Sequence, residues 1–164
     1  MANPIIQVET GQMDMTPYYM ATLACDIFGA AKAGSSISDR RWFKYLLYSI
    51  AIELGLKATL LNNNNTADQK KKNKDLGHNL TALRREAAQR LPDDFFDGAE
   101  VQAIDSISPF FRTKSLEYVS GSLLGQMMAG GKDLPKITDL EAVAQKVVDY
   151  LEREKHFIHS ATGA

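Results

Sequence analysis

Two short stretches carry the side chains best suited to chemistry. In the first, Glu53 stands four residues before Lys57, which places the carboxylate and the ammonium on one face of a helix, with the acid on the favourable N-terminal side. The surrounding residues are almost all apolar, and an unpaired charge is too costly to bury. The two residues therefore form either an intrahelical ion pair that steadies the core or one polar wall of a binding cleft.

The second stretch is Gly77-His78-Asn79-Leu80. Gly77 allows a turn, and His78 is expected at or near the N-cap of the helix that follows. At that position a side chain can bond a backbone N–H, or it can stand beside an anion held by the helix end. His78 is thus either a capping or bridging residue or part of an anion site.

The element that must position the first stretch is a long apolar helix, expected from about Ser38 to Leu61. From Trp42 onward its apolar residues cover nearly the whole circumference, which is typical of a helix with neighbours on most sides. The stretch is long enough to span a bilayer, but it carries Lys44, Glu53 and Lys57, each costing roughly 2.5–3.5 kcal/mol at a bilayer centre. We interpret it as a buried core helix.

Other signals mark further helices. Thr16-Pro17 is a typical helix start, and the helix it begins is expected to end at Gly34. Residues 62–75, which hold no aliphatic side chain larger than Ala, are expected to form a solvated loop.

The second half of the chain is predicted to hold a third helix that follows Gly77 and ends at Pro92, with leucines at helical spacing, and a shorter fourth helix broken by Pro109. The last helix is expected to start at the capping box Thr138-x-x-Glu141. The stretch 110–137 gives a weaker signal, with a short helix expected around 116–128. The fold class is therefore all-α: one domain, residues 1–164, built as an up-and-down bundle of about five helices, with residues 1–14 and 160–164 as flexible ends.

Glu53-Leu54-Gly55-Leu56-Lys57-Ala58, a polar loop and then Gly77-His78-Asn79-Leu80 with Leu83 resemble HEPN domains, in particular a prokaryotic subset with an E-x-x-L-K-A … G-H-x-L pattern. The resemblance spans roughly residues 40–91. It implies a compact helical bundle, frequently a homodimer, that binds a nucleotide, RNA or a partner protein. The expected ligand-binding residues are Glu53, Lys57 and His78, in a cleft between the second and third helices, with Tyr118 as a further contributor.

The nuclease members of that family use Arg-x(4–6)-His, and Arg153 with His159 meets the spacing. A toxin-type ribonuclease acting through this pair at a dimer interface is the enzymatic alternative. Two features argue against it: Glu154 follows the arginine, and the two side chains would point about 120° apart on a straight helix. The third alternative is an accessory protein-interaction module.

The composition of the chain limits the possible ligands and site types further. The formal net charge is -1, so a nucleic-acid ligand would need a local patch such as Lys70–Lys74 with Arg84, Arg85 and Arg90, which is otherwise a solvated segment. Cys25 is the only cysteine, so we expect neither a disulfide nor a cysteine metal site. Residues 125–132 (GQMMAGGK) do not fit a phosphate loop. We expect no cofactor, no metal and no membrane partner, and a cytoplasmic location, since the N-terminus does not resemble a signal peptide.

Overall fold

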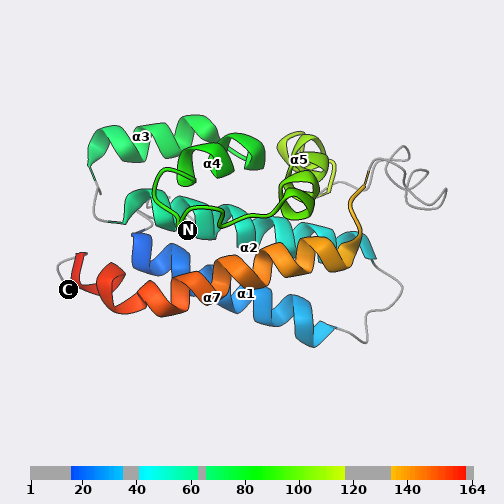
Figure 1. Ribbon diagram of the computed structural model, residues 1–164, viewed down its shortest axis with the longest axis horizontal. Helices are drawn as coiled ribbons and strands as arrows, with labels where there is room; N and C mark the ends of the chain where they lie inside the picture. The colour runs from blue at the N-terminus through cyan, green and yellow to red at the C-terminus, as the bar shows by residue number, and fades with distance from the viewer. Residues whose placement is uncertain (1–15, 35–40, 63–65, 117–133, 162–164) are drawn as a thin grey trace, which may run out of the picture.

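The computed structural model describes residues 16–34, 41–62, 66–116 and 134–161 (Figure 1). In these ranges the chain is helical and contains no strand, which confirms the all-α prediction for the part described. About five helices were expected and six are described. They are α1 (Pro17–Ala33), α2 (Arg41–Leu61), α3 (Ala67–Leu76), α4 (Leu80–Ala87), α5 (Gly98–Arg112) and α7 (Ile137–Ala161).

Helix α2 lies at the centre of the molecule. Helices α1 and α7 pack against it and against each other, and α4 packs on its other side. Helix α5 packs mainly against α4 and α7, and α3 forms the outer edge next to α4 (Figure 1). The side chains of α2 are buried around most of its circumference, and several are at most 2% exposed: Tyr48, Ala51, Ile52, Leu56, Ala58, Leu60 and Leu61. The predicted core helix is therefore confirmed over residues 41–61. Among the described residues, no helix combines the length and the apolarity needed to cross a bilayer.

Helix α1 begins as its sequence predicts. The hydroxyl of Thr16 accepts a hydrogen bond from the backbone N–H of Tyr19 at 3.2 Å, and Pro17 occupies the first turn, where a missing N–H costs nothing. Gly34 caps the other end, and its N–H donates to the carbonyl of Ala30.

The segment 62–75, predicted as a loop, contains a helix, so that prediction is wrong. Helix α3 starts after Thr66, whose hydroxyl accepts from the N–H of Gln69 at 3.2 Å. Its ten residues are mostly good helix formers (Ala, Gln, Lys), which compensates for the lack of an apolar stripe. Asn73 anchors the helix by donating from Nδ2 to the carbonyl of Lys57 at 3.1 Å.

The third predicted helix is shorter than expected. Helix α4 covers only Leu80–Ala87, and the chain then tightens into turns with bonds from residue i to i−3. Arg90, in the turns that follow, donates to the carbonyl oxygens of Leu60 at 2.6 Å and Asn62 at 3.2 Å. It thereby caps the C-terminal end of α2.

Two further expectations about helix ends are wrong. Helix α5 runs through Pro109 to Arg112, because the proline stands in the last turn, where its missing N–H removes a single helical bond. Helix α7 begins at Ile137, so Thr138 lies inside the first turn and its hydroxyl donates to the Asp139 carboxylate at 3.3 Å. The capping box is found on α5 instead, between Asp97 and Glu100. The short helix expected at 116–128 falls outside the described residues beyond Leu116.

Because Tyr48 is buried, the stability of the protein is expected to fall at alkaline pH. This residue of α2 is 1% exposed, and burial together with the Glu141 carboxylate raises the pKa of its phenol from 10.0 to about 12. Between these two values the unfolded chain has lost a proton that the folded protein keeps, so the free energy of unfolding falls as pH rises. In urea denaturation, the free energy of unfolding should fall by about 1 kcal/mol less for Tyr48→Phe than for wild type when the pH is raised from about 9 to 11. Tyr19→Phe, on the exposed side of α1, should follow wild type; equal losses in all three proteins would contradict the assignment.

Candidate functional site

Glu53, Lys57 and His78 meet between α2 and the turn that joins α3 to α4. We call these three residues the Glu53 cluster. The Lys57 ammonium donates to Oε1 of Glu53 at 2.6 Å, as the four-residue spacing predicts. The other carboxylate oxygen, Oε2, lies 3.1 Å from Nδ1 of His78, which is 25 residues further along the chain. One carboxylate therefore joins two basic side chains from separate elements.

Burial across the cluster is graded. The Glu53 side chain is 7% exposed, that of Lys57 15% and that of His78 42%. The acid is thus on the inside and the imidazole on the outside. The ring of His78 packs edge-on against Phe111 of α5, with the centroids 5.5 Å apart. This contact and the bond to Glu53 hold the ring in one orientation.

The hydrogen bond to Glu53 decides which ring nitrogen of His78 is available. An ionised carboxylate only accepts hydrogen bonds, so Nδ1 carries the proton and donates. The other nitrogen, Nε2, makes no hydrogen bond within the described parts of the chain. A neutral His78 therefore offers an acceptor at Nε2, and a protonated one offers a donor.

Two buried polar atoms close to the cluster lack a partner. The Oδ1 atom of Asn73, whose Nδ2 is bonded to the carbonyl of Lys57, makes no hydrogen bond in the described structure, and neither does the hydroxyl of Ser49, one helical turn before Glu53. Both residues are at most 4% exposed. Buried polar atoms are normally satisfied by protein, water or ligand. The polar region around Glu53 thus extends along α2 and onto α3.

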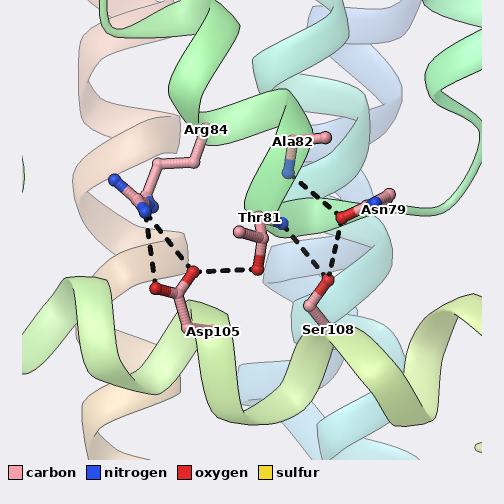
Figure 2. A network of polar contacts seen from close by, with 6 residues as sticks. All are labelled: Asn79, Thr81, Ala82, Arg84, Asp105 and Ser108. Atoms are coloured by element: carbon pink, nitrogen blue, oxygen red, sulfur yellow. Dashed lines mark hydrogen bonds and ion pairs between the residues drawn. The ribbon is translucent and has the colours of Figure 1, made fainter.

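His78 lies next to the N-cap of α4 but does not cap the helix; of the capping and bridging roles expected for it, its bond to Glu53 corresponds to the bridging one. The cap is Asn79, whose Oδ1 accepts from the N–H of Ala82 at 3.1 Å (Figure 2). The Ser108 hydroxyl on α5 accepts from the N–H of Thr81 at 3.2 Å. These two N–H groups are therefore already bonded and are not available to an anion.

Figure 2 shows that Asp105 of α5 joins this helix to α4. This acid was not among the residues predicted from the sequence. Asp105 accepts from the Thr81 hydroxyl at 2.8 Å and lies 3.4 Å from the guanidinium of Arg84. The capping role of Asn79, in contrast, could have been predicted, because an asparagine directly before the apolar positions Leu80 and Leu83 is a typical N-cap. Nothing in the sequence could have paired Thr81 with a residue 24 positions away.

The remaining predicted site residues are not brought to the cluster. Tyr118 lies outside the described residues. Arg153 is exposed on α7, where its Nε donates to the carbonyl of Asp149 at 3.2 Å. The structure describes the backbone of α7 through Ala161 but not the side chain of His159, so the Arg153–His159 ribonuclease stays a prediction.

Helix α7 also carries a shallow depression lined by Asp149, Glu152 and Arg153. Among the described residues, its lining consists of two carboxylates and one guanidinium. Within the described residues, no three His, Cys, Asp or Glu side chains gather closely enough to hold a metal ion. The Glu53 cluster is therefore the strongest candidate site.

Comparison of the chain with protein-family models, with curated proteins and with solved structures finds no match.

Proposed function

We propose that this chain is a HEPN-like helical domain that binds the phosphate group of a nucleotide or of RNA at the Glu53 cluster. One observation supports this most: a buried carboxylate holds an ammonium on one oxygen and a half-exposed imidazole on the other. Burying a charge costs several kcal/mol unless its partners are well placed. A core that needed only stability would be served as well by apolar side chains at these positions.

The hydrogen-bonding capacity of the cluster matches an oxyanion. An ammonium has three N–H donors and Lys57 uses one of them on Glu53, so further donors remain. The charges of Glu53 and Lys57 cancel, and protonation of His78 leaves a net positive charge at the exposed side. Of the three ligand classes expected from the sequence, a nucleotide or RNA fits better than a partner protein, because phosphate oxygens accept from both basic side chains.

The cluster predicts that His78→Gln weakens nucleotide binding. Glutamine can still donate to Glu53, but it cannot become a charged donor towards a phosphate. Isothermal titration with AMP, ATP and a short single-stranded RNA should show at least about a 10-fold loss of affinity for whichever ligand binds the wild type, equivalent to about 1.4 kcal/mol.

Lys136→Gln, an exposed lysine before α7, is the control and should bind like wild type. Failure of all three ligands to bind wild-type protein at millimolar concentration would refute the proposal. Equal affinity of wild type and His78→Gln would also refute it, because the ligand would then lie elsewhere.

A further inference from the structure

Positive charge is concentrated in one part of a chain that is close to neutral. Residues 69–90 hold seven of the 19 Lys and Arg residues but only two of the 20 Asp and Glu residues. Their net charge is +5, which leaves -6 on the rest of the chain. This segment forms most of α3, the turn after it and α4, so the asymmetry in sequence is also an asymmetry in space (Figure 1).

Several of these charges are used within the fold. Lys72 is paired with Glu86 at 2.5 Å, which ties α3 to α4, and Arg84 lies 3.4 Å from Asp105. Arg90 caps α2. The exposed Lys71, Lys74 and Arg85, in contrast, make no ion pair within the described residues.

Helix geometry gathers lysines along one edge of α3. Asn73 is its buried residue, and Lys72 turns towards α4. At about 100° per residue, Lys70, Lys71 and Lys74 fall within about 100° of one another, on the side away from Lys72. Both acids of the helix, Asp68 and Asp75, fall on the side of Lys72. Lys71 and Lys74 are the exposed members of this group, and we call these two residues the basic edge of α3.

We propose that the basic edge binds the sugar–phosphate backbone of a nucleic-acid duplex without reading its sequence. Lysines in a row on a helix match a row of phosphates, and neutralising phosphates releases counterions. Helix α3 has no aromatic side chain on which an unpaired base could stack, which disfavours single strands. Its exposed face has no large apolar residue to insert into a bilayer, which disfavours an anionic membrane.

This inference does not rest on the proposed function. Lys71 and Lys74 are not part of the Glu53 cluster, and the basic edge would bind a duplex whether or not the cluster binds a nucleotide. The Lys71→Glu/Lys74→Glu variant separates the two proposals, because it should lose duplex affinity but bind AMP and ATP like wild type.

The test is fluorescence anisotropy with a labelled 20-base-pair RNA duplex, the matching DNA duplex and a single-stranded RNA of equal length. Two phosphate contacts, by the exposed Lys71 and Lys74, predict that affinity for the duplex falls about 12-fold when salt rises from about 50 to 200 mM. Lys71→Glu/Lys74→Glu should lower duplex affinity by at least about 10-fold at 50 mM salt and flatten the salt dependence by about two contacts. The RNA and DNA arms show which duplex is preferred.

Arg112→Glu/Lys136→Glu is the matched control, since it changes net charge equally through exposed residues, and the start of α7 lies at the other end of the molecule from α3 (Figure 1). It should bind within about threefold of wild type, and circular dichroism should show all variants folded. Equal loss in both double variants would overturn the proposal, since net charge alone would then explain binding. Wild-type protein that binds no duplex at 50 mM salt, or binds only the single strand or phosphatidylserine vesicles, would overturn it too.

Discussion

Glu53→Gln is expected to lower the free energy of unfolding by about 2 kcal/mol. The carboxylate is almost fully buried and bonded to Lys57 at 2.6 Å and His78 at 3.1 Å. Glutamine has nearly the same shape but no charge, so it leaves a largely buried ammonium without a counterion. Breaking a fully buried pair costs about 3–5 kcal/mol, and the 15% exposure of the Lys57 side chain reduces that figure. Urea denaturation measures the change, and the melting temperature should fall by roughly 4–8 °C.

The same substitution in a second Glu–Lys pair supplies the control. Lys72 and Glu86 are 2.5 Å apart, but their side chains are 50% and 30% exposed, so Glu86→Gln should cost less than about 1 kcal/mol. Adding Lys57→Met to Glu53→Gln removes the unpaired charge and should recover part of the loss. If Glu53→Gln costs no more than Glu86→Gln, the cluster does not bury its charges in the way the structure indicates.

The sequence predicted those features of the fold that depend on neighbouring residues. Thr16-Pro17 capped α1 as expected, because a cap needs only the next three residues. The all-round apolar pattern after Trp42 predicted a buried helix, and the side chains of Ile52 and Leu56 are indeed fully buried. Both signals are local, and tertiary packing reinforces them.

The wrong predictions come from signals that tertiary contacts override. Helix α3 has no apolar stripe, but the bond from Asn73 to the carbonyl of Lys57 holds it on α2. Pro109 did not end α5, since Ile107 and Phe111 on either side of it are buried in the core. Packing of that kind stabilises a helical turn more than one missing backbone bond destabilises it.

In the candidate site, too, one contact could be predicted from the sequence and another could not. The pairing of Glu53 with Lys57 follows from a spacing of four residues and could be read from the sequence. The distance from His78 to Glu53 depends on how the turn after α3 packs on α2, and no local pattern contains it. The resemblance to HEPN domains grouped the three residues in advance; the geometry shows them in contact, and the binding role stays a proposal.

Gly55→Ala is expected to destabilise the protein by about 2 kcal/mol, although alanine is the better helix former by about 1 kcal/mol. A Cβ atom at this position would lie 2.3 Å from Cγ1 of Val147 and 3.2 Å from Cδ1 of Leu151. Both are on α7, so the glycine allows α2 and α7 to approach closely. A methyl group there forces the two helices apart and loosens the core around the Glu53 cluster two residues away. Chemical denaturation gives the size of the loss.

Two companion variants separate this clash from a general intolerance of glycine replacement. Gly29 in α1 has open space where its Cβ would stand, so Gly29→Ala should stabilise the protein by about 0.5–1 kcal/mol. Val147→Ala should destabilise wild type, because it leaves a cavity, but should stabilise the Gly55→Ala protein, because it removes the clashing methyl group. A reversal of sign between the two backgrounds is the specific signature of contact between Gly55 and Val147. Simple additivity would mean that α2 and α7 do not meet at this point.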